Sequence, residues 1–144
     1  MAQVMGIENQ PIGLLLLVLG VLPGICEELL FRGVILSLLP HNFSDRKKVV
    51  VVGSLFGAFH MSLLRFAPTA MLGLILTFLA LRTGSIFPCM ILHACHNMLS
   101  VYLAVHYKEG IPPLPVTAGA VAVGVLGLGL LYFSCLKAVK EKPV

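Results

Sequence analysis

Residues 12–39 read IGLLLLVLGVLPGICEELLFRGVILSLL. The stretch is long enough to cross a bilayer, because a helix of about 20 apolar residues spans the hydrocarbon region. It nevertheless contains Glu27, Glu28 and Arg32, and such side chains cost about 2.5–3.5 kcal/mol each at the centre of a membrane helix. Pro23-Gly24 predicts a kink. The stretch therefore predicts a transmembrane helix that carries polar chemistry.

The composition of the whole chain also indicates a membrane protein. Of its 144 residues, 58% are hydrophobic and 11% are charged, and the mean hydropathy is +1.01. This leaves too little polar surface for a soluble domain. The net charge of +4 comes from basic residues in short stretches between apolar runs, which is typical of membrane orientation and not of nucleic-acid binding. The length allows one domain, residues 1–144, with membrane lipid as a partner.

Short polar or Pro- and Gly-containing stretches divide the apolar sequence into helices. They predict an all-α fold, a polytopic transmembrane helix bundle of about five helices. We expect these helices at residues 12–39, 48–66, 68–82, 86–106 and 114–136. The third is short for a membrane span, so a tilted or re-entrant segment is an alternative.

The basic residues divide unevenly if all five helices cross the membrane. One side receives Arg46, Lys47, Lys48, Arg82, Lys137, Lys140 and Lys142, and the other receives Arg65 and Lys108. The positive-inside rule assigns the first side to the cytoplasm. We therefore expect an integral, multi-pass protein of the cytoplasmic membrane with its C-terminus inside and its N-terminus outside.

Polar side chains recur at one depth in three predicted helices. With a rise of about 1.5 Å per residue from the cytoplasmic helix ends, Glu28, His60 and His93 lie about 14–18 Å deep. Glu28 and Arg32 are four residues apart and share a helix face, as do His93 and Asn97. We therefore expect these groups to converge around a space large enough for one water molecule.

The chemistry that these groups suit is hydrolysis. A buried glutamate can take a proton from water, imidazoles can orient that water, and an imidazole or amide N–H can stabilise an oxyanion. Arg32 would offset one of the two adjacent carboxylates. His96 lies about 60° from His93 around the helix and is interpreted as a packing or hydrogen-bonding residue. No serine has the spacing of a nucleophile elbow, and the cysteines have no CxxC spacing.

Three short motifs extend this interpretation. Residues 27–32 read EELLFR, residues 56–60 read FGAFH and residues 93–97 read HACHN. In this order, over about residues 20–100, they resemble the EExxxR, FxxxH and HxxxN motifs of the CPBP family. That family comprises the type II CAAX prenyl endopeptidases and the bacterial bacteriocin-processing or immunity (Abi) proteins.

The resemblance implies an intramembrane endopeptidase. Glu27 and Glu28 would activate water, and His60 would help to hold it. His93 and Asn97 would bind water or stabilise the oxyanion, and Arg32 completes the first motif. The implied substrate is a peptide or membrane protein, prenylated or of the bacterial signal or bacteriocin type.

Metal-dependent and metal-free mechanisms both remain open at this point. A divalent ion such as zinc would take its ligands from Glu27, Glu28, His60 and His93, although these residues lack the HExxH spacing. Without a metal, the glutamates and histidines would activate the water themselves.

Other interpretations also remain open. Members of the family commonly have further N-terminal helices, so this chain is a minimal member, a fragment, or a protein that completes its bundle as a homo-oligomer. A catalytically silent immunity or scaffold protein would keep the fold without needing the base. A small proton or ion transporter would use the same buried charges, but it lacks the inverted repeat common in transporters. The three ordered motifs favour the enzyme.

Overall fold

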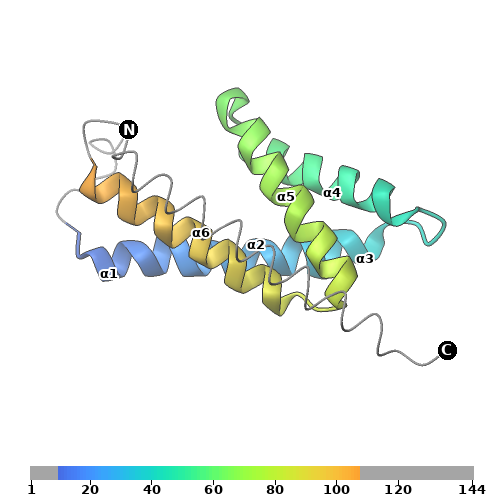
Figure 1. Cartoon of the computed structure of the whole chain (residues 1–144), viewed down its shortest axis with the longest axis horizontal. Helices are drawn as coiled ribbons and strands as arrows, with labels where there is room; N and C mark the ends of the chain where they lie inside the picture. The colour runs from blue at the N-terminus through green and yellow to red at the C-terminus, as the bar shows by residue number, and fades with distance from the viewer. Residues whose placement is uncertain (1–9, 108–144) are drawn as a thin grey trace. The chain divides into compact units, whose positions relative to one another are not determined.

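The structure is a computed structural model that describes residues 10–107. The chain divides into two units, Met1–Tyr102 and Leu103–Val144. Its elements are α1 (Ile12–Leu15), η3 (Leu16–Val21), α2 (Leu22–Glu28), η4 (Leu29–Ile35), α3 (Leu36–Leu38), α4 (Asp45–Phe59), α5 (Leu63–Thr83) and α6 (Phe87–His106) (Figure 1). No strand occurs in the described part of the chain, so the prediction of an all-α fold is confirmed. The predicted helix at 114–136 lies outside the described residues.

The first five elements form one continuous helix, Ile12–Leu38, close to the predicted span of 12–39. Two parts of it, η3 and η4, are wider π-helical turns. The first lies just before Pro23, whose missing N–H removes an i→i−4 hydrogen bond. The second contains Arg32, and π-turns within α-helices often lie at functional sites.

The junction between the next two helices differs from the prediction. α4 ends at Phe59 and α5 begins at Leu63, so the predicted boundaries of 48–66 and 68–82 are wrong here. Met61 has φ 45°, which interrupts the helix. Sequence patterns miss this turn because it contains no proline or glycine, and its two polar residues, His60 and Ser62, stand singly between apolar ones. Consequently α5 has 21 residues and is not the short segment that was expected, and Pro68 lies inside it.

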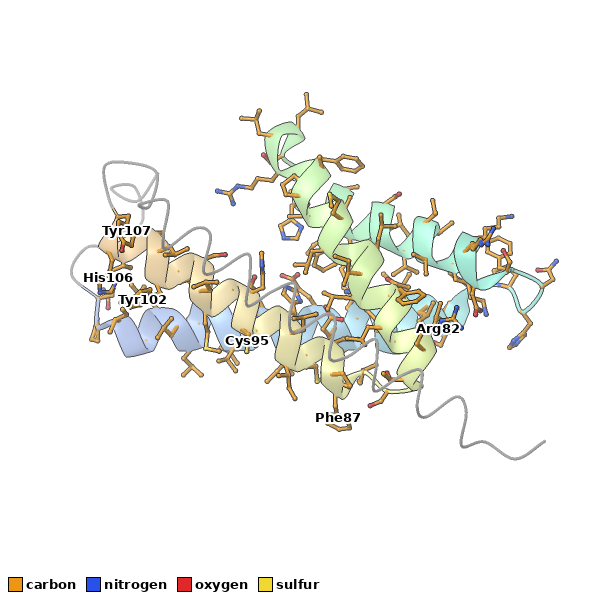
Figure 2. All side chains as sticks on the ribbon, viewed as in Figure 1. Arg82, Phe87, Cys95, Tyr102, His106 and Tyr107 are labelled. Atoms are coloured by element: carbon orange, nitrogen blue, oxygen red, sulfur yellow. The ribbon has the colours of Figure 1, made fainter. Side chains whose placement is uncertain are left out.

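Three helices of the described part are long and apolar enough to cross a membrane: Ile12–Leu38, Leu63–Thr83 and Phe87–His106. Large apolar side chains such as Leu14, Met71 and Phe87 are exposed on them, and Phe87 is labelled in Figure 2. Large apolar side chains that face outward along three long helices are consistent with contact with lipid. These helices support a membrane protein.

Small residues allow the helices to pack closely. A side chain at Gly57 on α4 would place its Cβ 2.7 Å from the Cβ of Ala70 on α5. A side chain at Gly24 on α2 would place its Cβ 2.8 Å from the backbone nitrogen of Ala94 on α6. Figure 1 shows α4 beside α5 and α6 beside α2. Close packing on small residues is typical of membrane helices, and here it brings α2, α4, α5 and α6 around the polar residues.

Candidate active site

A buried ion pair lies on the first long helix. Arg32 Nη1 donates to Glu28 Oε1 over 2.7 Å, and both side chains are fully buried. Arg32 Nη2 donates to the carbonyl oxygen of Gly73 on α5 over 2.8 Å. The guanidinium also lies 4.9 Å from the ring centroid of Phe56 on α4. The interaction that the i, i+4 spacing predicted is therefore present, and it ties this helix to α4 and α5.

The same carboxylate holds a histidine from α6. His93 Nδ1 lies 2.8 Å from Glu28 Oε1. An ionised carboxylate only accepts hydrogen bonds, and Glu28 is paired with Arg32, so Nδ1 carries the hydrogen. This assigns Nε2 of neutral His93 as an acceptor. The carboxylate thus sets both the tautomer and the orientation of the imidazole.

The other ring nitrogen of His93 faces Glu27. His93 Nε2 lies 3.9 Å from Glu27 Oε2, and the Glu27 side chain is 22% exposed whereas Glu28 is fully buried. A separation of 3.9 Å is too long for a direct hydrogen bond, and polar groups at such distances are commonly bridged by water.

Some buried polar atoms have no hydrogen-bond partner within residues 10–107. They are Glu27 Oε2, Glu28 Oε2 and Arg32 Nε. Leaving a buried polar atom unpaired costs about 1–3 kcal/mol, and more when the group is charged. Glu27 Oε2 is therefore an acceptor without a partner. Together with His93 Nε2, which lies 3.9 Å away, it is suited to bind one small polar molecule.

His60 occupies a different position from the predicted one. It follows the last residue of α4 instead of lying within a helix of 48–66. Its Nδ1 donates to the carbonyl oxygen of Phe56 over 3.0 Å. The Phe56 ring centroid lies 5.2 Å from that of His60 and 5.4 Å from that of His93. Both imidazoles thus contact one phenyl ring, but no hydrogen bond joins His60 to the glutamates in the described part.

Asn97 and His96 lie on α6 beyond His93. Asn97 is half-buried one turn further along, and it makes no hydrogen bond to any described residue. His96 is exposed. The structure therefore brings together Glu27, Glu28, Arg32 and His93, and Asn97 is outside their hydrogen bonds.

In the described part of the chain, Glu27, Glu28, His60 and His93 do not form a site for a metal ion. Within the described part, no three His, Cys, Asp or Glu side chains gather so that they could hold one. Glu28 Oε1 and His93 Nδ1 are hydrogen-bonded to each other, so neither atom is directed at a shared position where a metal ion could bind. The set Glu27, Glu28, His60 and His93 is not assembled as a ligand shell.

Sequence reasoning missed three residues that support the site. Phe56 is fully buried and contacts Arg32, His60 and His93. The Gly73 carbonyl oxygen accepts from Arg32 and also from Thr77 Oγ1, the latter over 2.7 Å. Phe56 is the first residue of the FGAFH motif, so a signal for it was present. A backbone carbonyl leaves no signal in the residue type.

Comparison with known proteins agrees with the motifs. The family described as type II CAAX prenyl endopeptidase Rce1-like matches residues 9–99, which is more than half of the 144 residues and includes all three motifs. No curated protein and no solved structure matches the chain. The resemblance seen in the motifs is confirmed: the chain belongs to the Rce1-like family of type II CAAX prenyl endopeptidases.

Proposed function

We propose that this chain cleaves a peptide bond within the membrane by metal-free hydrolysis and that Glu27 is the general base. The observation that carries the proposal is the arrangement around His93. Glu28 Oε1 holds Nδ1 of that ring at 2.8 Å, and Nε2 faces the unpaired Glu27 Oε2 at 3.9 Å. Glu28 also accepts from Arg32, so it is engaged by two donors and acts as the orienting group. Glu27 keeps the lone pairs that a base needs.

The proposed reaction starts with a water molecule bound between Glu27 Oε2 and His93 Nε2. The water donates one hydrogen bond to each atom, which leaves its oxygen lone pair directed at the carbonyl carbon of the substrate. As the oxygen attacks, Glu27 takes one proton and a tetrahedral intermediate forms. The carbon–nitrogen bond then breaks, and Glu27 returns the proton to the leaving nitrogen. The products are a carboxylic acid and an amine.

His60 and Asn97 receive different roles in this proposal. Because His60 Nδ1 donates to the Phe56 carbonyl, neutral His60 offers only an acceptor at Nε2. It therefore suits water and not an oxyanion. The side-chain amide of Asn97 can donate, and we propose that it stabilises the oxyanion when the substrate is bound. The proposed substrate is a prenylated peptide or membrane protein, as the family's description suggests.

A cleavage assay tests the proposal. The purified chain in liposomes is given a prenylated C-terminal peptide that carries a fluorophore and a quencher. Glu27→Gln keeps the shape of the side chain but removes the base, so kcat should fall by about 10²–10⁴-fold. Asp45→Asn is the matched control, because Asp45 is an exposed carboxylate in the first turn of α4. A chelator should leave the rate unchanged.

Two results would reject the proposal. If Glu27→Gln retains the activity of the unaltered chain, Glu27 is not the base. If the unaltered chain cleaves nothing while remaining folded, the catalytically silent interpretation replaces the enzyme.

A further inference from the structure

The turn between α4 and α5 carries the most exposed large apolar side chains in the described part of the chain. Met61, Leu63 and Leu64 are 93%, 94% and 92% exposed. Phe59, at the end of α4, is also more than half exposed. Apolar residues that are fully exposed and adjacent commonly mark a surface that contacts protein or membrane.

The backbone conformation of this turn indicates that the turn does not face water. Met61 has φ 45°, a conformation in which Gly, Asn or Asp is favoured and a large side chain is uncommon. In a turn facing water, a polar or glycine residue would relieve the backbone and expose no apolar surface. The chain keeps a methionine there, followed after Ser62 by two leucines.

The packing of α4 on α5 determines which residues lie at the opposite end of the helix pair from the turn. Gly53 packs against Leu74 and Gly57 against Ala70, so the two helices are antiparallel and each step along one matches a step along the other. Continuing this register places Asp45 level with Arg82. The basic residues Arg46, Lys47 and Lys48 and the basic residue Arg82 therefore mark the same end of the helix pair, which we place at one membrane surface.

From that surface, α4 does not reach the other side. Its 15 residues span about 22 Å at 1.5 Å per residue, against about 30 Å of hydrocarbon. On α5, Leu63 lies 19 residues before Arg82, which is about 28 Å at the same rise, so the turn reaches the far edge of the hydrocarbon but still lies within it. Arg65, the one charged residue in this turn of α5, has a side chain long enough to reach the interface.

We propose that residues 59–64 are inserted into the hydrocarbon of the bilayer, where lipid acyl chains surround Met61, Leu63 and Leu64. This inference goes beyond the proposed hydrolysis and does not depend on it. Because His60 directly precedes Met61, it also places one candidate site residue at an end of the helix pair that lipid can reach.

Single-tryptophan fluorescence tests the proposal, because the chain contains no tryptophan. Met61→Trp and Leu64→Trp are each placed in the full chain and reconstituted in phosphatidylcholine vesicles with or without bromine on the acyl chains. His41→Trp is the control, since His41 is exposed in the loop before the basic residues. We expect blue-shifted emission from positions 61 and 64 and strong quenching by brominated lipid. Aqueous iodide should quench them weakly and should quench His41→Trp more.

Two outcomes would overturn the proposal. Strong quenching by iodide at both positions would place the turn in water. Blue-shifted emission that neither quencher reduces would mean that protein covers the turn, either from another part of the chain or from a second copy. The second variant guards against a local disturbance at Met61, and circular dichroism establishes that each variant keeps its helix content.

Discussion

Replacing Arg32 by methionine tests whether the buried ion pair holds the helices and the site together. The guanidinium makes a 2.7 Å bond to Glu28, a 2.8 Å bond to the Gly73 carbonyl, and a contact with the Phe56 ring at 4.9 Å. Methionine has a similar length but makes none of these interactions. Glu28 would remain fully buried with His93 as its only partner among the described residues.

The expected cost follows from these contacts. Hydrogen bonds to charged groups contribute about 1.5–3 kcal/mol each, and removing one partner of a buried pair usually costs about 3–5 kcal/mol because the other charge is left uncompensated. We therefore expect Arg32→Met to lower the free energy of unfolding by about 3–5 kcal/mol. That is a large part of the 5–15 kcal/mol typical of folded proteins.

Unfolding in detergent micelles, followed by circular dichroism, measures this cost. Arg82→Met is the matched control, because Arg82 also lies over a phenyl ring, that of Phe78, at 5.1 Å. Arg82 is exposed near the end of α5 (Figure 2), and surface substitutions usually change stability by less than about 0.5 kcal/mol. Combining Arg32→Met with Glu28→Gln should recover much of the loss, since no buried charge then stays unpaired. Equal effects of Arg32→Met and Arg82→Met would refute the reasoning.

Two further predictions concern packing and topology. Gly57→Ala should destabilise the protein by about 1–3 kcal/mol, because the new Cβ would lie 2.7 Å from that of Ala70. Gly33→Ala is the control: a Cβ at Gly33 would have nothing within 4 Å, so this variant should be neutral or gain up to about 1 kcal/mol from helix propensity. Thermal unfolding compares the two variants, and equal losses of stability would contradict the close packing at Gly57. Cysteines placed at Lys108 and Lys140 should react with a membrane-impermeant maleimide from opposite sides of the membrane, and labelling from the same side would contradict a crossing by the predicted helix at residues 114–136.

The sequence predicted the features that depend on local spacing. The long first helix follows from its apolar length, and the Glu28–Arg32 pair follows from the four-residue separation on one helix face. The α4–α5 turn could not be found in this way, because Met61, Leu63 and Leu64 continue the apolar pattern of both helices. As a result His60 was placed inside a helix.

Contacts between helices were also beyond the reach of the sequence. Order and depth suggested that Glu28 and His93 are neighbours, but not that Nδ1 of the histidine bonds Glu28 while Nε2 faces Glu27. That choice depends on how closely α2 and α6 approach, which Gly24 and Ala94 determine. The involvement of the Gly73 carbonyl depends likewise on the packing of α5 and has no counterpart in a side-chain pattern.

The different surroundings of Glu27 and Glu28 explain how two adjacent glutamates can divide the work. Successive residues of a helix point about 100° apart, so the two carboxylates cannot share one partner set. Glu28 faces inward, where Arg32 and His93 both donate to it, and its charge is compensated in the buried site. The Glu27 side chain is partly exposed, and its Oε2 has no hydrogen-bond partner among the described residues. A compensated carboxylate is a poor proton acceptor but a stable anchor for an imidazole, whereas one with free lone pairs can accept a proton from a bound water molecule and act as a base. If Glu27 and Glu28 exchanged roles, the compensating arginine would have to stand four residues after Glu27, at position 31. The chain has Phe31 there, and its ring packs against Phe56.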